Sequence, residues 1–283
     1  NLENLEREMS VYQNTNGMPM ADGRNLHMGV APGEVANRVI TVGTTSRAEI
    51  IASFFDSNPE PIRIQSSRGF LTITGYYQGV RISVVAIGMG PSMMDFFVRE
   101  IRAVVEGPMA IVRFGTCGGL TDYSRAGTIV VATEGSSYIS RNYDFFPSGN
   151  ENIQPYFFYN IAPSNPTLSE TLKNELTQVV GEDKVATGLN VTADSFYSSQ
   201  NRIDDNFDDH NKTIISQVES RFPQARTLEM ETFILFHLAS CSKIPIYASS
   251  AAIIVAHRNT GHVIDEATHS DLEINGGKSV LNA

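Results

Sequence analysis

The chain has 283 residues, of which 41% are apolar and 18% charged, as is typical of a globular protein large enough to bury a sizeable core. Its net charge of −10 argues against general binding to nucleic acids or acidic membranes, and its two cysteines exclude a framework of several disulfides. No apolar run approaches the ~18 residues of a membrane span, and the first ten residues lack the apolar core of a signal peptide, so we expect a cytoplasmic protein.

Strands and helices are predicted to alternate after a polar, irregular segment. The elements are, in chain order, a strand over 39–43, a helix over 45–56, a pair of strands within 69–90, a helix over 91–106, strands over 109–119 and 126–133, a helix over 165–181, a strand over 184–194, a helix over 228–241 and a strand over 245–256. Such alternation predicts an α/β fold in which helices flank a mixed, mostly parallel sheet. No linker, low-complexity tract or repeat divides residues 1–283, so we expect a single domain.

Several familiar binding motifs are incomplete. The sequence GMG at 88–90 opens a dinucleotide fingerprint, but Met93 occupies the place of its third glycine. The sequence GGKS at 276–279 resembles the end of a phosphate-binding loop whose first glycine is replaced by Leu272. The histidines do not pair at metal-ligand spacings, so no metal site is predicted.

An arginine stands where the strand over 109–119 leaves the core. In the sequence RFGTCGG, glycines follow Arg113, which places it at the carboxyl end of a buried strand, where open α/β sheets bind ligands. A lone arginine there more often pairs with a carboxylate or extends to solvent. Thr116 adds a hydroxyl, however, and Gly43 with Arg47 forms a second strand end that opens a helix. Guanidinium groups and helix N-terminal amides together suit a phosphate dianion.

A second polar group follows the strand over 184–194. Phe196 and Tyr197 precede Gln200 and Arg202, whose amide and guanidinium could bind the donor and acceptor edge of a small planar ring. A polar surface loop is the common alternative for such a segment.

Two carboxylates flank Met230 in the sequence LEMET, which is predicted to open the helix over 228–241. Glu229 or Glu231 could accept hydrogen bonds from a pair of vicinal hydroxyls. Acidic residues in a first helical turn also complement the helix dipole, so this alternative stays open.

These separated motifs resemble those of uridine phosphorylases, a family that also holds trimeric and hexameric purine nucleoside phosphorylases. The sequences VGTTSR, GMGPS, VRFGTCGGL, DSFYSSQNRIDD and LEMET occur in the family's order over roughly residues 27–262. The pair of Gln200 and Arg202 after Phe-Tyr points to the uridine members. The resemblance implies a barrel-like central sheet and an N-terminal segment, residues 1–37, that contributes to a subunit interface.

The resemblance also implies a role for each site residue. Phosphate would be bound by Gly43, Arg47, Arg68, Arg113 and Thr116. Ribose would be bound by His27, Met230 and Glu231. Uracil would be bound by Cys117, Gly118, Phe196, Gln200, Arg202 and Arg258. Four of these are implied to be catalytic, namely Arg113, Gln200, Arg202 and Glu231. His27 and Arg68 are expected to reach the site of a neighbouring subunit.

The implied activity is the reversible phosphorolysis of uridine to uracil and ribose 1-phosphate in pyrimidine salvage. Inorganic phosphate is the co-substrate, and no cofactor or metal ion is expected. The sequence GTCGGL looks like that of animal enzymes, which favours a homodimer over a hexamer. The resemblance also implies that the active site is shared across the subunit interface. The alternatives are a purine nucleoside phosphorylase or a nucleosidase of the same fold, or an inactive nucleoside-binding paralogue.

Three segments depart from the family pattern or go beyond it. Gly69 replaces a glutamate that helps bacterial members hold potassium, so the resemblance leaves open whether a potassium site exists. The sequence THSDLEINGGKSVLNA, residues 268–283, is expected to lack the family's long terminal helix. The aromatic residues within 140–160 suit a lid or an interface segment.

Overall fold

A large mixed sheet organises the computed structural model, which describes residues 16–121, 124–148 and 152–283. Its twelve strands are β3 (Arg38–Val42), β4 (Ile62–Gln65), β5 (Leu71–Tyr77), β6 (Val80–Ala86), β7 (Met109–Gly119), β8 (Ile129–Val131), β9 (Ser136–Arg141), β10 (Tyr156–Phe158), β11 (Val185–Thr187), β12 (Leu189–Ala193), β13 (Ala225–Glu229) and β14 (Ile246–His257). The helices are α2 (Thr45–Ala52), α3 (Pro91–Val104), α4 (Phe145–Ser148), α5 (Pro166–Val180), α6 (Ile214–Arg221), α7 (Thr232–Cys241) and α8 (Glu266–Asn282), with 3-10 turns η1 (Glu182–Lys184) and η2 (Ser198–Gln200). None of the helices in these described ranges is long and apolar enough to cross a membrane.

The sheet curves back on itself around its longest strands. β7 pairs in parallel with β3 and β14 and antiparallel with β13. β14 continues to β8 and β8 to β11, while β13 continues to β12. Only Gly188 separates β11 from β12, so the path closes into the barrel-like arrangement that the family resemblance implies. Gly188 is required at this bend because a Cβ there would lie 2.4 Å from Cγ of Arg226.

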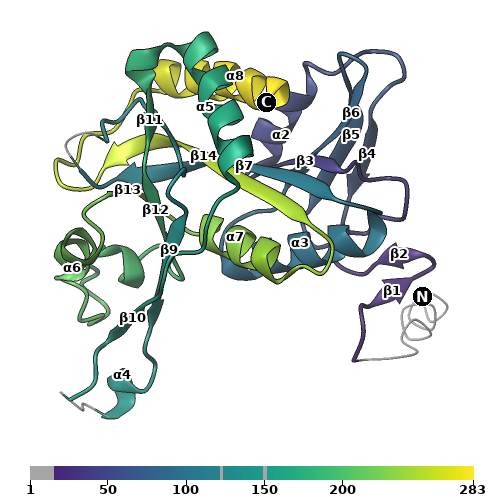
Figure 1. Ribbon diagram of the computed structural model, residues 1–283. Coiled ribbons are helices and arrows are strands. Elements are labelled where there is room, and N and C mark those ends of the chain that lie inside the picture. Colours follow the sequence, from purple (N-terminus) through teal and green to yellow (C-terminus); the bar gives the residue numbers. More distant parts are fainter. Residues whose placement is uncertain (1–15, 122–123, 149–151) are drawn as a thin grey trace.

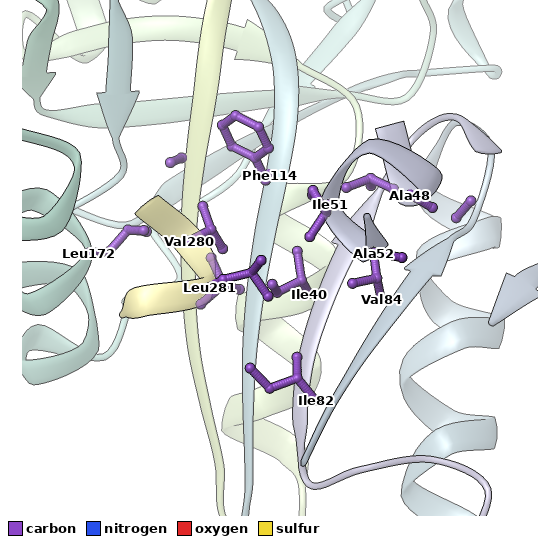
Figure 2. Close-up of a cluster of buried hydrophobic side chains, with 14 of the residues drawn as sticks. Ile40, Ala48, Ile51, Ala52, Ile82, Val84, Phe114, Leu172, Val280 and Leu281 are labelled. Atoms are coloured by element: carbon purple, nitrogen blue, oxygen red, sulfur yellow. The ribbon is translucent and has the colours of Figure 1, made fainter. Parts of the chain in front are cut away.

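Helices cover both faces of this sheet, as Figure 1 shows: α2, α5 and α8 lie on one side and α3 and α7 on the other. The first core includes Ile40, Ile51, Phe114 and Leu281, which converge from β3, α2, β7 and α8 in Figure 2. A second core lies beneath α3 and α7. The predicted single-domain α/β architecture with flanking helices is confirmed.

The C-terminal helix is a correction to the sequence prediction. Residues 268–283 were expected to lack a long helix, but α8 runs from Glu266 to Asn282. Its start is capped by Asp265, whose Oδ1 accepts a hydrogen bond from the backbone N–H of Thr268 at 2.7 Å. Its Gly276–Gly277 pair, a poor helix former by itself, is stabilised by packing against the first core.

Other boundaries differ in smaller ways. The strand predicted over 184–194 is two strands, and the helix predicted from residue 228 begins at Thr232, because residues 225–229 form β13. The predicted irregular segment 1–37 contains a two-stranded hairpin, β1 (Met20–Ala21) with β2 (Arg24–Asn25), and its first fifteen residues lie outside the described residues. Residues 140–160 form parts of β9, α4 and β10, and residues 149–151 lie outside the described ranges. β4, β9, β10 and α6 were not predicted.

Candidate active site

A cavity of about 440 Å³ opens where β3, β6, β12, β13 and β14 end beside β7. Twelve of the fourteen residues predicted for the site line it: Gly43, Arg47, Arg113, Thr116, Cys117, Gly118, Phe196, Gln200, Arg202, Met230, Glu231 and Arg258. Tyr197, which stood beside Phe196 in the sequence argument, does not line it. Groups from five separated segments thus share one cavity.

Arg113 is buried beside this cavity with part of its guanidinium unused. Nη2 lies 2.5 Å from Oε2 of Glu231, and Nε lies 3.5 Å from Oε2 of Glu229. Nε and Nη1 are buried and have no hydrogen-bond partner in the part of the chain that the structure describes. Buried donors without acceptors are costly, so an anion bound here would relieve that cost.

The two carboxylates of LEMET have different environments. Glu229 accepts hydrogen bonds from Nδ2 of Asn190 at 2.8 Å and from Oγ1 of Thr192 at 2.6 Å, and from the backbone N–H groups of Glu231 and Thr232. Glu229 therefore fixes the junction of β13 and α7.

Glu231 accepts from the backbone N–H of Gly90 and from Arg113, both at 2.5 Å. Burial raises the pKa of the Glu231 carboxyl, an effect that the nearby Arg113 opposes. With fewer protein donors than Glu229, Glu231 is the carboxylate that can exchange partners with hydroxyl groups in the cavity.

Arg47 reaches the same end of the cavity from the first turn of α2. The Oγ1 atom of Thr44 accepts a hydrogen bond from the backbone N–H of Arg47 at 3.3 Å and caps this helix. Gly43 and Gly88, at neighbouring strand ends, are joined by a backbone hydrogen bond of 3.1 Å. Burial lowers the pKa of Arg47, while Glu273 of α8 opposes that effect.

A second group of lining residues belongs to the loop after β12. Nη1 of Arg202 donates to Oε1 of Gln200 at 2.9 Å, and its guanidinium lies 3.5 Å from the centre of the Phe196 ring. Nη2 of Arg258 donates to the backbone carbonyl of Gln200 at 2.5 Å. Because Arg202 occupies the side-chain oxygen of Gln200, the amide NH₂ remains to donate to a ligand.

Burial and the neighbouring Arg258 lower the pKa of Arg202 to about 10. The loop itself is held by Asn211, whose Nδ2 donates to the carbonyls of Ser198 at 3.0 Å and Arg202 at 2.8 Å. Asn201 adopts a left-handed conformation with φ 56°, which asparagine tolerates better than most residues. The loop thus keeps Gln200 buried beside two cations.

His27 and Arg68 do not line the cavity. Nδ1 of His27 lies 2.5 Å from Oε1 of Glu100, and its ring packs on Phe96 at a centroid distance of 4.2 Å. Arg68 is exposed in the turn between β4 and β5. A Cβ on Gly29 would lie 3.9 Å from Cβ of Ser66, so the two segments are neighbours. Their predicted action on a neighbouring subunit stays a prediction.

Sequence reasoning missed some lining residues and one contact. Thr44 and Met89 line the cavity without a chemical signature that would distinguish them in sequence. Glu273 contacts Arg47 from 226 positions away, and no spacing could have paired them.

Comparisons with known proteins identify the family and the fold. The family model described as the phosphorylase superfamily matches residues 37–283. A solved structure from a structural and catalytic study of two diverse uridine phosphorylases of the oomycete Phytophthora capsici is 42% identical, with a TM-score of 0.91, and the match covers 96% of this chain and 97% of that one. A Trypanosoma brucei nucleoside phosphorylase is 18% identical with a TM-score of 0.76 over 94% of this chain and 100% of that one, and shows the shared fold.

Curated relatives are matched over shorter stretches. A DeoD-type purine nucleoside phosphorylase of Exiguobacterium is 33% identical over 42% of this chain and 48% of its own length. Another, from Bacillus velezensis, is 27% identical over 64% of this chain and 72% of its own length. The chain spans about half the length of the first curated relatives it matches. Since the family model covers all but the first 36 residues, the chain belongs to the phosphorylase superfamily.

Proposed function

We propose that the chain is a uridine phosphorylase, which converts uridine and phosphate reversibly to uracil and ribose 1-phosphate. The observation that carries this proposal is a single cavity with two distinct groups of lining residues. The first group, named the phosphate end, has the buried donors of Arg113 that lack acceptors, and the second, named the base end, has the Gln200–Arg202 pair. The first suits an anion, and the second, which supplies guanidinium and amide donors, suits the carbonyl groups of a pyrimidine.

In this proposal phosphate binds between the end of β3 and the middle of β7. Arg47 and Arg113 supply guanidinium donors, Thr116 a hydroxyl, and Gly43 a backbone that can approach closely. Positioning the nucleophile in this way converts an encounter in solution into a reaction within one complex. The two arginines supply the charge neutralisation, and phosphate is the only co-substrate required.

The ribose lies between the two ends, beside Met230 and Glu231. The carboxylate of Glu231 accepts hydrogen bonds from the 2′- and 3′-hydroxyls, for which it exchanges part of its contact with Arg113 and Gly90. A phosphate oxygen attacks C1′ as the bond from C1′ to N1 of the base breaks. Positive charge develops on the sugar while the bond from C1′ to N1 lengthens, and the negative charges of phosphate and Glu231 stabilise it.

The electron pair of the broken bond leaves with the pyrimidine, which later takes a proton from water. Arg202 and the amide NH₂ of Gln200 donate hydrogen bonds to this base. These bonds strengthen as negative charge develops, so they stabilise the departing anion more than the neutral base. Arg258, whose pKa is lowered by burial, adds a second cation behind Gln200.

The same proposal includes a cytoplasmic homo-oligomer, a dimer rather than a hexamer, acting in pyrimidine salvage. His27 and Arg68 lie on neighbouring surface segments and would enter the site of a second copy. Mixing Arg68→Ala subunits with Arg113→Ala subunits tests this, because one site in the mixed assembly would be intact. We expect mixing to restore part of the activity. A mixture of the two variants that stays inactive after its subunits have exchanged would contradict a shared site.

The purine alternative has support from the curated relatives, which are purine nucleoside phosphorylases. The family resemblance implies that purine members typically carry an aspartate where this chain has the sequence AHR at 256–258. That difference, together with the Gln200–Arg202 pair, favours uridine.

The direct test is uracil release from uridine with and without inorganic phosphate, with inosine in parallel. Phosphate-dependent release that yields ribose 1-phosphate is the expected result. Release without phosphate would make the chain a nucleosidase, and preferential turnover of inosine would make it a purine enzyme. Uridine binding without turnover would identify an inactive paralogue.

A further inference from the structure

Glu273 of α8 is the protein partner of Arg47 at the phosphate end of the cavity. Its Oε1 atom lies 2.7 Å from Nε and 2.7 Å from Nη2 of Arg47. The two side chains are 5% and 15% exposed, so this ion pair lies largely out of water. A buried pair of this kind fixes the orientation of both side chains more strongly than a surface pair does.

The contact uses one edge of the guanidinium. An arginine has five N–H donors in a planar fork, and Glu273 occupies the edge formed by Nε and Nη2. Among the described residues, no hydrogen bond joins Nη1 to another group of the chain. The second edge is therefore left for a ligand in the cavity that Arg47 lines.

Each arginine of this end pairs with a carboxylate from another element, and Oε1 of Glu273 also lies 3.6 Å from Nε2 of His269. Arg113 pairs with Glu231 at 2.5 Å, and Arg47 pairs with Glu273 at 2.7 Å. Burial is the main cause that lowers the pKa of Arg47, and the positive charge of Arg113 adds to it because the two cations repel each other. Glu273 offsets that repulsion for the arginine that is carried by a helix rather than by the sheet.

Close packing brings Glu273 to this position. A Cβ on Gly277 would lie 2.8 Å from Cγ1 of Ile51, and a Cβ on Gly276 would lie 2.5 Å from Cζ of Phe114. Glu273 precedes Gly277 by one turn of α8, just as Arg47 precedes Ile51 by one turn of α2. The glycine pair thus lets α8 approach α2 and β7 closely enough for the carboxylate to meet Arg47.

We propose that Glu273 is a positioning residue that holds Arg47 by one edge so that the other edge meets phosphate. The inference rests on the proposed function of the cavity as a phosphate site. It assigns to the C-terminal helix a part in substrate binding, although α8 itself does not line the cavity.

The test compares Glu273→Ala and Glu273→Gln with Asp271→Asn, which removes the same charge from an exposed position of the same helix. Calorimetry measures the Kd for inorganic phosphate, and steady-state kinetics measure KM for phosphate and for uridine. We expect Glu273→Ala to raise the Kd and KM for phosphate roughly 10- to 100-fold, the usual effect of losing an outer partner that orients a binding group. Glu273→Gln should give a Kd and KM for phosphate between those of the wild type and of Glu273→Ala, because its amide oxygen can still accept a hydrogen bond from Nε of Arg47. Asp271→Asn should match the wild type.

The outcomes separate this inference from the proposed function. A parallel rise in KM for both substrates would show a merely structural role and overturn the proposal, as would tighter phosphate binding in both variants. Unchanged phosphate binding in Glu273→Ala and Glu273→Gln would contradict the role of Glu273 and leave the proposed function of the cavity intact. A wild-type protein that binds no phosphate contradicts the proposed function itself. If Glu273→Ala does not fold, Glu273→Gln preserves the volume and decides the question.

Discussion

The phosphate end and the base end of the cavity are formed by different kinds of structural element. At the phosphate end, Arg47, Arg113 and Glu231 are 3–4% exposed and are held by the sheet or the first turn of a helix. At the base end, Phe196 is 45% exposed, and the polar groups belong to a loop held by Asn211. Under the proposed function, the charged groups are therefore held by the rigid scaffold, whereas the groups proposed to bind the base belong to a loop that can vary without disturbing the sheet.

Arg113→Ala is the strongest way to break this comparison. We expect kcat/KM to fall by ~10³-fold or more, because the variant loses a donor to the phosphate and to charge in the transition state. It also leaves two buried carboxylates without their cation, which costs about 3–5 kcal/mol of stability. Kinetics with varied phosphate measure the first effect, and urea unfolding measures the second.

Arg113→Lys keeps the charge but not the fork, and Arg99→Ala removes an exposed arginine paired with Asp95 as a control. The lysine variant should recover stability and only part of the activity. Wild-type activity in Arg113→Ala would contradict the assignment of the phosphate end.

Gln200→Leu sharpens the comparison from the other end. The variant keeps the volume but removes the donor to the pyrimidine, so kcat/KM for uridine should fall ~10- to 100-fold. KM for phosphate should stay near that of the wild type. Equal effects on both substrates would mean that the two ends do not divide the work.

The two carboxylates of LEMET give a smaller contrast within the phosphate end. In Glu229→Gln an amide NH₂ would oppose backbone N–H donors that the carboxylate now satisfies, and we expect a loss of about 1–3 kcal/mol of stability. Glu231→Gln also places an amide NH₂ against one of its two donors, the backbone N–H of Gly90 or Nη2 of Arg113, and it should in addition reduce the preference for uridine over 2′-deoxyuridine. Thermal unfolding and paired kinetics on the two nucleosides distinguish them, and reversed effects would exchange their roles.

The smallest effect concerns the cysteines. Burial raises the pKa of the Cys117 thiol well above its ordinary value, so at neutral pH it stays protonated and unreactive. Cys241 is exposed. Iodoacetamide should modify Cys241 without loss of activity, as mass spectrometry would show. Rapid labelling of Cys117 would mean that this part of the cavity opens more widely than the structure indicates.

The sequence predicts the parts of the site that follow strong local patterns. Gly43 directly follows β3, as predicted. Arg113 and Thr116, however, lie within β7 and not at its carboxyl end, because the glycines of RFGTCGG continue the pairing with β14 as far as Gly119. All three residues line the cavity. β13 was missed because its sequence ARTLE is short and only partly apolar, so LEMET was assigned to a helix alone. The structure divides that motif between the end of a strand and the start of α7.

The remaining misses depend on contacts between distant segments. The missed helix α8 contains Gly276 and Gly277, each of which costs about 1 kcal/mol in a helix, but the pair allows close approach to Phe114 and Ile51. The partner of Arg47 and the placement of His27 beside Glu100 depend on folded proximity alone. Local sequence pattern therefore predicts which segments form strands. The contacts that hold Arg47 and His27 depend on segments that only the folded structure brings together.

The contact between Arg47 and Glu273 also has a consequence for biosynthesis. The arginine emerges from the ribosome 226 residues before its partner, so β3 and α2 can form early while this arginine still lacks its counter-charge. The phosphate end is completed only when α8 docks through its glycine pair onto a sheet that is already in place. A nascent chain that still lacks α8 therefore has no carboxylate from that helix to pair with Arg47, and the proposed phosphate end is completed only in the fully folded chain.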